Sequence, residues 1–312
     1  MSNSWSELLK ENDRKETSWK RIAVICAPTI ETLRCFEKTF LSRGCMLSNQ
    51  SMYSIGFGFD SLNDGIMGNR LIDCELYSVL FPLQENSLKC LESFVDVKST
   101  AIKWWFLLDW SLEDQKFWLR KLIKSLDTLK AANANLTAGS VTINCLNTDQ
   151  IYTKQKNTTA WHSNHVEFLQ QSLRSFSFLE KCSLIYSDPK DPTTSNTQLF
   201  GQLLADNYRE IQADFVSATK ILIPFGSDTP GLIKTLDESF EPLQVLEKGF
   251  IAQRFEKFIP GENLEGEEET EDEKEDDEDI HYDIDHPYSV DVQQSLSKLY
   301  EKGKQRFTIN DL

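Results

Sequence analysis

Short apolar runs alternate with segments of helical periodicity along most of this chain, and this alternation limits its fold more than any other feature. The run Ala101–Asp109 is the strongest strand candidate, and apolar spacing from 117 to 129 predicts the helix after it, with Ser111 as its cap. Further strands are predicted at 21–26, 53–60, 71–81, 141–146, 182–187 and 220–225, and further helices near 30–41, 166–176 and 196–208. Strands and helices that alternate in this way form an α/β domain, with a mostly parallel sheet and helices on both faces.

Composition divides the chain into four parts. Residues 1–20 are predicted to form an N-terminal arm with a short helix, and residues 21–258 the α/β domain. Residues 259–286 form an acidic linker, in which 15 Asp and Glu residues stand against one lysine and account for −14 of the net charge of −16. Such a segment is predicted to be disordered, because its charges repel and it has little apolar surface to bury. Residues 287–312 contain a short predicted C-terminal helix.

Both ends of the chain carry a short apolar stripe. The residues of each stripe recur at helical spacing: Trp5, Leu8 and Leu9 near the start, and Val292, Leu296, Leu299 and Tyr300 near the end. Helices this short are marginal on their own, so each stripe is expected to pack against a larger surface. That surface is either a partner protein or the chain's own domain, and the sequence leaves both open.

Charge and hydropathy exclude several classes of function. Outside the acidic linker the remaining charge is only −2, so the chain offers no basic field for nucleic acid or for an anionic membrane. No apolar run approaches the roughly 18 residues of a membrane span, and the N-terminus lacks a signal-peptide pattern, so a cytosolic protein is expected. The seven cysteines are scattered without a CxxC pair, which argues against a disulfide framework or a zinc site.

The loop between the first predicted strand and helix decides whether a domain of this architecture can hold a nucleotide. A working phosphate loop reads G-x-x-x-x-G-K-[ST]: the glycines let the backbone wrap the phosphates, the lysine neutralises charge and the hydroxyl binds magnesium. Here Cys26 and Glu31 take the glycine positions, Thr32 the lysine position and Leu33 the hydroxyl position. Pro28 also removes a backbone donor. The sequence therefore predicts a degenerate P-loop and no cofactor.

The other nucleotide-binding elements are also incomplete. The nearest match to D-x-x-G is Asp73-Cys-Glu-Leu76, which lacks the glycine. The base-reading element N-K-x-D falls on Leu146, Asn147, Thr148 and Asp149, and only the aspartate is kept. An aspartate directly after a strand is more often a turn or helix-capping residue, so we do not interpret Asp149 as a guanine contact.

Three other features suggest chemistry only weakly. His162 and His165 form an HxxH pair without further ligands nearby, so a capping or surface position is preferred to a metal site. Asp109 ends the strongest strand, where α/β enzymes hold catalytic residues, but we expect it to cap a helix or fix a turn. The acidic linker lacks the glycine-centred spacing of a calcium loop. No catalytic residue and no metal site is therefore predicted.

Several blocks of the sequence occur in a recognisable order. They are Trp5-Ser-Glu-Leu-Leu9; Trp105-Phe-Leu-Leu-Asp-Trp-Ser111 with Trp118-Leu-Arg-Lys-Leu122; Glu167-Phe-Leu-Gln-Gln-Ser-Leu-Arg174 with Cys182-Ser-Leu-Ile-Tyr-Ser187; and Ile221-Leu-Ile-Pro-Phe-Gly-Ser-Asp228 with 234–240. In these blocks, over about residues 4–240, the chain resembles the cytoplasmic dynein light intermediate chains, and its length resembles the short yeast-type member. The resemblance implies a Ras-like G domain.

The resemblance also implies a function and partners. It implies a non-catalytic subunit of the cytoplasmic dynein motor complex that binds the heavy-chain tail, with other dynein subunits and cargo or cortical adaptors as further partners. Motor assembly, nuclear migration and spindle positioning would follow, in the cytoplasm on microtubules, at the spindle pole or at the cell cortex. The candidate heavy-chain contacts are the terminal stripes, Trp5, Leu8, Leu9, Leu296, Leu299 and Tyr300.

The chain departs from the vertebrate members, which keep a phosphate loop with glycine and lysine and carry an adaptor-binding helix in a long tail. Here only residues 286–312 follow the linker, and they match no adaptor motif. Two alternatives stay open. One is a diverged nucleotide-binding GTPase with an atypical loop, and the other is an acidic-tailed chaperone or adaptor protein that holds basic partners such as histones.

Overall fold

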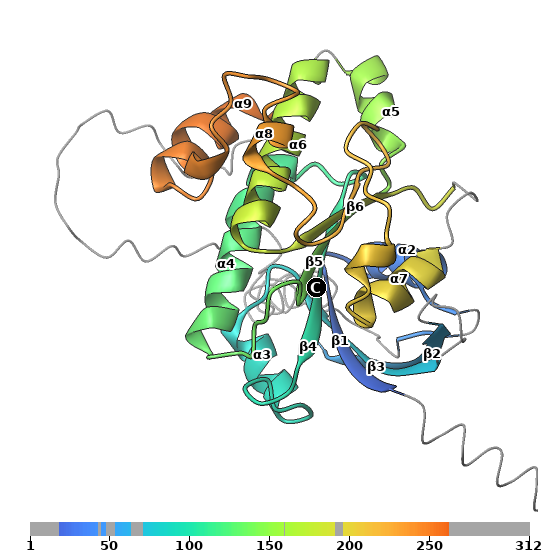
Figure 1. The fold of residues 1–312 in the computed structure, drawn as a ribbon. Helices are drawn as coiled ribbons and strands as arrows, with labels where there is room; N and C mark the ends of the chain where they lie inside the picture. The colour runs from blue at the N-terminus through green and yellow to red at the C-terminus, as the bar shows by residue number, and fades with distance from the viewer. Residues whose placement is uncertain are drawn as a thin grey trace, which may run out of the picture. The chain divides into compact units, whose positions relative to one another are not determined.

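A seven-stranded sheet forms the centre of the α/β domain in the computed structural model, which describes residues 19–42, 45–47, 54–63, 71–158, 160–190 and 196–261 (Figure 1). The strands lie side by side in the order β2-β3-β1-β4-β5-β6-β7. Their bounds are β1 Trp19–Ala27, β2 Gly56–Asn63, β3 Leu71–Leu80, β4 Ile102–Asp109, β5 Val141–Leu146, β6 Ser183–Ser187 and β7 Leu222–Ile223.

The central strands run parallel, and each edge strand is antiparallel to its neighbour. β1 lies between β3 and β4 in parallel register, and the parallel pairing continues through β5 to β6. β2 and β7 pair antiparallel with β3 and β6. Every residue of β4 is buried, as expected of a central strand that is covered on both faces. The predicted mostly parallel sheet is confirmed.

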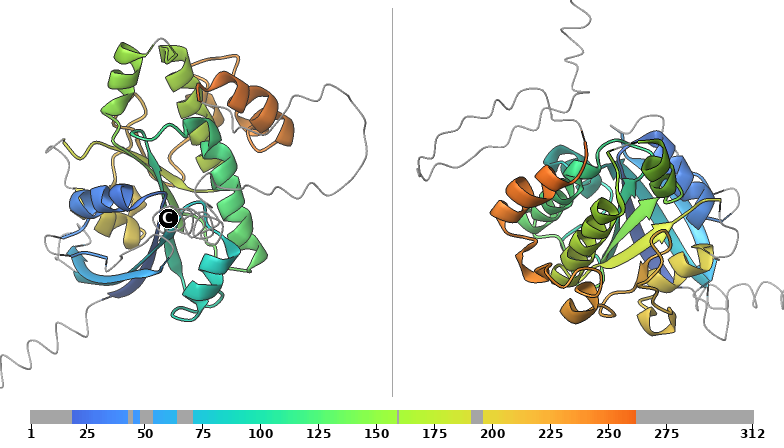
Figure 2. Two further views of the ribbon diagram at one scale, coloured as in Figure 1. Left: turned by 180° about the vertical axis from the view of Figure 1, so that it is seen from behind. Right: turned by 90° about the horizontal axis from the view of Figure 1, so that it is seen from above.

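Helices cover both faces of this sheet (Figure 2). Their bounds are α2 Ile30–Phe40, α3 Glu85–Glu92, α4 Trp118–Ala131, α5 Gln150–Asn157, α6 Ser163–Leu179 and α7 Asn196–Leu204. On one face, α2 and α7 pack around Trp105 of β4, whose ring centroid lies 5.5 Å from that of Phe36 and 4.8 Å from that of Phe200. On the other face, α3, α4 and α6 contribute to the core that contains Trp104 and Phe106. Within the described ranges, no helix is long and apolar enough to cross a membrane.

The last described residues pack along α6. They form α8 Pro230–Ile233, η3 Pro242–Gln244, η4 Phe250–Phe255 and α9 Glu256–Phe258. Arg174 of α6 donates two hydrogen bonds to Asp228, at 2.8 and 2.9 Å, and both side chains are buried. Arg120 of α4 binds Glu256 in the same two-pronged way, at 2.8 and 2.6 Å. These pairs fix residues 228–256 to the helices beneath them.

Some predicted boundaries were wrong. Ser111 does not cap the helix after β4, because α4 begins at Trp118, after the short helix η1 (Gln115–Phe117). The helix predicted over 196–208 ends at Leu204, and Asp206 then adopts a left-handed conformation with φ of 61°, which an α-helix cannot contain. The strand predicted over 220–225 keeps two residues, since Pro224 has no N–H to pair.

The terminal predictions fall almost wholly outside the described residues. Of the arm, only Trp19 and Lys20 are described, and they begin β1; of the linker, only 259–261 are described. The predicted C-terminal helix lies outside, as do the six candidate heavy-chain contacts: Trp5, Leu8, Leu9, Leu296, Leu299 and Tyr300.

Candidate functional site

The topology places any ligand crevice between β1 and β4. The connection that leaves β1 runs through α2 towards β2 and β3 on one side, whereas the connection that leaves β4 runs through α4 to β5 on the other. In open α/β sheets, ligands bind at such a divergence, beyond the carboxyl ends of the strands. The candidate site is therefore formed by the ends of β1, β4 and β5 at Ala27, Asp109 and Leu146 and by the residues that follow them.

The turn between β1 and α2 is shorter than a phosphate-binding loop, and one amide of the following helix is already capped by the chain itself. Only Pro28 and Thr29 separate the strand from the helix. Thr29 has extended backbone angles, and its Oγ1 accepts the Thr32 N–H at 3.1 Å, so the chain itself satisfies a helix donor that an anion would use. Glu31 is exposed in the first turn, where its negative charge favours the positive helix end. The negative charge of Glu31 thus already occupies the helix end at which a phosphate would bind.

A buried hydrogen bond bridges the crevice between β1 and β4. Thr32 Oγ1 donates to Asp109 Oδ2 at 2.7 Å, and neither side chain is more than 3% exposed. The other carboxylate oxygen, Oδ1, accepts from Ser111 N at 2.8 Å, from Ser111 Oγ at 2.6 Å and from Asn147 Nδ2 at 2.8 Å. Asp109 therefore ties together the residues that follow β1, β4 and β5. We call Thr32, Asp109, Ser111 and Asn147 the Asp109 network.

The remaining phosphate-loop positions belong to the core. Cys26 lies in β1, between Val79 of β3 and Phe106 of β4, and is fully buried; this burial raises the pKa of its thiol well above the usual range. Leu33 packs in the cluster beneath α2. Cys35, two residues after Leu33 on α2, lies 3.5 Å from the Asn147 side chain, and burial, followed by the negative charge of Asp109, raises its pKa to about 11. A thiol in this state is not a nucleophile near neutral pH.

The base-reading positions make internal contacts as well. Leu146 is the last residue of β5 and is buried in the core beneath α2 and α7. Asn147 has a φ of 55° and directs its amide to Asp109. Asp149 stands at the N-cap position of α5, as the sequence suggested, but its carboxylate accepts from Lys190 Nζ at 2.6 Å and from Gln150 Nε2 at 3.1 Å rather than from a backbone N–H of the helix. The hydrogen bond and charge of Asp149 in turn raise the pKa of Lys190.

The D-x-x-G assignment was wrong. In the parallel register of β1 and β3, Asp73 lies beside Lys20, near the start of both strands. The carboxyl end of β3 is Leu80, beside Ala27. Asp73 accepts a hydrogen bond from Ser61 Oγ of β2 at 2.8 Å. This contact lies near the amino-terminal end of β3, whereas the crevice lies beyond the carboxyl ends of the parallel strands. It therefore has no connection with the candidate site.

His162 and His165 form a helix cap. The His162 N–H donates to Nδ1 of His165 at 3.1 Å, at the start of α6, which agrees with the preferred capping interpretation. Over the described part of the chain, no group of three or more His, Cys, Asp or Glu side chains could hold a metal ion.

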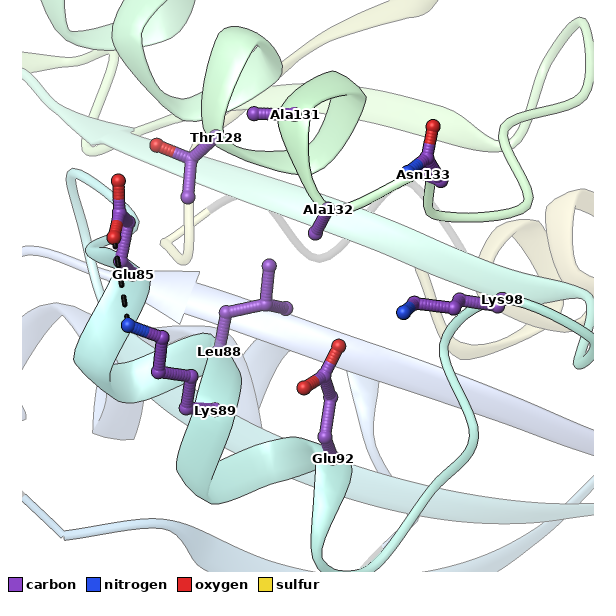
Figure 3. Close-up of a pocket in the computed structure, with 9 residues that line it drawn as sticks. All are labelled: Glu85, Leu88, Lys89, Glu92, Lys98, Thr128, Ala131, Ala132 and Asn133. Carbon is purple, nitrogen blue, oxygen red and sulfur yellow. Dashed lines mark ion pairs between the residues drawn. The ribbon is translucent and has the colours of Figure 1, made fainter.

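Two cavities of the described domain lie away from the Asp109 network. One of about 290 Å³ opens between α3 and the end of α4, and Figure 3 shows Leu88 between the charged residues Glu85, Lys89, Glu92 and Lys98. Lys89 and Glu85, one turn apart on α3, form an exposed ion pair at one side of it, at 3.6 Å. A smaller cavity of about 70 Å³ lies at the end of β6, next to the start of α7. Neither is lined by a residue of the network.

Sequence reasoning missed two of these contacts. Thr29 was not recognised as the cap of α2, although a threonine three residues before a second threonine and next to an acidic first turn is a capping signal. The bond from Thr32 to Asp109 was also missed, although Asp109 ends β4 and Thr32 lies in the first turn of the helix after β1, and a parallel sheet brings these two strand ends to one side.

Comparison with known proteins decides the family. A sequence model of the dynein light intermediate chain family matches residues 125–272. The cytoplasmic dynein intermediate light chain of Candida glabrata is 34% identical over 252 residues, which cover 76% of this chain and 79% of that one. This chain belongs to the dynein light intermediate chain family. The family resemblance read from the ordered sequence blocks is confirmed.

Two further comparisons extend the assignment of this light intermediate chain. The cytoplasmic dynein intermediate light chain of Saccharomyces cerevisiae is 29% identical over 321 residues, which cover 98% of this chain and 99% of that one. A crystal structure of a dynein light intermediate chain's conserved domain superposes with a TM-score of 0.56 at 18% identity, over 73% of this chain and 88% of that one. The predicted Ras-like fold is confirmed.

Proposed function

We propose that this light intermediate chain is a non-catalytic subunit of the cytoplasmic dynein motor complex and that it binds the tail of the dynein heavy chain. In this capacity it supports motor assembly and microtubule-based movement such as nuclear migration and spindle positioning. The corresponding location is the cytoplasm, on microtubules, at the spindle pole or at the cell cortex. Membership of the family and the names of its relatives support the dynein assignment.

The observation that carries the non-catalytic part is the bond between Thr32 and Asp109. Catalysis of phosphoryl transfer needs cationic groups, magnesium and backbone amides around the phosphates. In this chain a neutral hydroxyl holds the lysine position and binds a carboxylate, and Thr29 has satisfied an amide of the helix end. A phosphate at this place would meet Glu31 and Asp109 instead of cations.

The flanking stripes are the proposed heavy-chain contacts. Trp5, Leu8 and Leu9, together with the C-terminal stripe, carry apolar side chains on short segments, which is the pattern of a helix that lies in a partner's groove. Other dynein subunits, and cargo or cortical adaptors, are further partners in the same proposal.

Co-purification from cells that express the tagged full chain tests the assignment. Mass spectrometry should identify a dynein heavy chain among the partners. Replacing Trp5, Leu8 and Leu9 together with alanine should reduce heavy-chain recovery, whereas alanine at the polar residues Glu11, Asp13 and Arg14 serves as the control from the same segment. Undiminished recovery from the first variant contradicts the N-terminal contact. Recovery of histones that disappears when residues 262–285 are removed would instead favour an acidic-tailed chaperone.

Equilibrium binding of labelled GTP and ATP, in the presence of magnesium, tests whether the bond between Thr32 and Asp109 closes the crevice between β1 and β4 to nucleotides; we call this the closed crevice. The purified chain should show no binding at micromolar nucleotide. Saturable micromolar binding of either nucleotide would revive the alternative of a diverged GTPase and would refute the non-catalytic proposal in its present form.

A further inference from the structure

The exposed leucine side chains of the domain are gathered in one short span. Among the leucines whose burial the structure describes, those that are exposed all lie between residues 232 and 246: Leu232, Leu236, Leu243 and Leu246. Their exposed fractions run from 36% at Leu246 to 63% at Leu243. Single exposed leucines are common, whereas several in one place with a polar border mark an interaction surface. We call these four residues the leucine surface.

Local turns direct the four leucines away from the core. Leu232 and Leu236 lie four residues apart on α8 and the turn that follows it, and Leu243 and Leu246 lie three apart on the turns that begin with η3. Side chains three or four apart share one face of a helical turn. The residues between them that point inwards pack in the core with α6: Ile233, Phe240 and Val245. Each turn therefore has a buried inner side and a leucine pair on its outer side.

Hydrogen bonds fix this layer in place. Gln171 of α6 donates through Nε2 to the carbonyl oxygens of Ile233 and Asp237, at 3.0 and 3.2 Å. Lys234 binds Glu241 at 2.7 Å and so joins the turn after α8 to the start of η3, and α8 and η3 also contact each other. The two leucine pairs thus belong to one surface, which is formed before a partner arrives. Binding to a preformed surface costs little ordering of the chain.

Acidic side chains border the leucine surface. The span from 230 to 249 contains two basic residues, of which Lys234 is paired with Glu241. It contains four exposed acidic residues: Asp237, Glu238, Glu241 and Glu247. A second copy of this chain would bring the same negative charges to the contact, which disfavours self-association through this surface. A partner with an apolar stripe and basic flanks complements both the leucines and their border.

We propose that the leucine surface binds an amphipathic helix with basic flanks. The span from 230 to 249 contains no strand to which an extended segment could add, whereas paired leucines on neighbouring turns suit the apolar stripe of a helix. The identity of the partner rests on the proposed function: the helix belongs to the tail of the dynein heavy chain. The terminal stripes lie outside the described residues, so the leucine surface adds a contact within the folded domain.

Co-purification of the dynein heavy chain with the tagged full chain, quantified by mass spectrometry, tests this contact. Leu243→Ser combined with Leu246→Ser should lower heavy-chain recovery at least about tenfold, because both leucines lose the apolar area that a bound helix covers. Leu232→Ser with Leu236→Ser should act in the same direction. Phe94→Ser is the matched control: Phe94 is 67% exposed, and it follows α3, which lies at the opposite end of the domain from α8 (Figures 1 and 2), so recovery should not change.

Charge reversal tests the basic flanks of the partner helix. Glu238→Lys combined with Glu247→Lys should lower heavy-chain recovery at least about threefold at low salt, because like charges would then face each other. The loss should shrink as salt is added, since exposed charges are screened. A recovery that is unchanged or higher in this variant would contradict the basic flanks and overturn the proposal.

The remaining outcomes separate this contact from the proposed function. Undiminished recovery with both pairs of leucine variants overturns the contact and leaves the proposed function in place, whereas a wild-type chain that recovers no heavy chain overturns both. A dimer of the purified chain that Leu243→Ser with Leu246→Ser converts to a monomer would assign the surface to a second copy. Faster hydrogen–deuterium exchange in a terminal segment of the same variant would assign it to the chain itself. Either result overturns the proposal, and an unchanged Tm shows that the variant is folded.

Discussion

Removing the Asp109 carboxylate is the most direct test of the closed crevice. Asp109→Ala leaves the hydroxyl of Thr32 and the amide of Asn147 without their acceptor, while Ser111 is exposed and can turn to water. A hydrogen bond to a charged group contributes about 1.5–3 kcal/mol, and Thr32 can recover part of its bond through Thr29, 2.9 Å away. We therefore expect the free energy of unfolding to fall by about 3 kcal/mol, which lowers Tm by roughly 6–12 °C for a domain of this size.

Urea unfolding followed by tryptophan fluorescence measures this loss, because Trp105 and Trp110 lie in the core beside the network. Asp96→Ala is the matched control: Asp96 accepts comparable hydrogen bonds from Lys98 and Ser99 in an exposed turn, and its removal should hardly move the midpoint. A loss below about 1 kcal/mol at Asp109 would mean that its bonds add little over water and would refute the reasoning.

A double-mutant cycle isolates the bridge itself. Thr32→Val keeps the shape of the side chain and removes its hydroxyl, so its coupling to Asp109→Ala reports the bond across the crevice. We expect a coupling free energy of about 1–2 kcal/mol, in the range measured for residues that share a hydrogen-bond network. Additive single effects would show that the two strand ends are held together by packing alone.

Three further substitutions test other parts of the domain. His165→Gln should flatten the pH dependence of stability: burial, and then a neighbouring histidine, lowers the pKa of His165, whereas glutamine stays neutral and can still accept the helix-capping N–H. Asp228→Ala leaves the buried guanidinium of Arg174 without its partner and should cost about 3–5 kcal/mol. Gly139→Ala should cost about 1–3 kcal/mol, because φ is 76° and the new Cβ would lie 2.5 Å from the Tyr208 hydroxyl.

The same unfolding assay, with pH varied for His165, checks each of these changes. The pKa of His165 is lower in the folded chain than in the unfolded chain, so the unfolded chain binds the proton first as the pH falls. The contribution of neutral His165 to the free energy of unfolding is therefore complete above about pH 6.5 and declines below it. If the free energy of unfolding depended on pH in the same way in wild type and His165→Gln, this expectation would be wrong. Lys234→Ala, which breaks an exposed pair with Glu241, should cost less than about 1 kcal/mol. Gly226→Ala, with φ of 80° and no atom within 4 Å, separates backbone strain from the clash at Gly139.

The sheet and its helices could be predicted because burial leaves a direct record in the sequence. β4 is apolar at nearly every position because both of its faces are covered, and α2 repeats apolar residues at the spacing of one helical face. Boundaries were less predictable where a single backbone angle decides them. The left-handed Asp206 ends the segment after α7, and nothing in the apolar pattern marks it.

For the candidate site, the sequence predicts which nucleotide-binding groups are absent, but not which contacts take their place. The sequence shows that Thr32 stands where a lysine is needed, but it does not show what replaces the missing charge. That replacement depends on strand order: Thr32 meets Asp109 because β1 lies beside β4, although the two residues are 77 positions apart. The misplaced D-x-x-G assignment has the same origin, since the register of β3 against β1, not the motif, decides which end of the strand Asp73 occupies.

The Asp109 network also shows how this chain satisfies groups at a crevice where other α/β domains hold a ligand. A bound ligand stabilises a folded domain by binding only the native state, and its loss normally leaves strand ends and helix amides without partners. Here Thr29 satisfies a helix amide, and the carboxylate of Asp109 stands where an anionic ligand would collect donors from three strand ends. Under the proposed function, the folded domain needs no diffusible ligand at this crevice and serves as a scaffold.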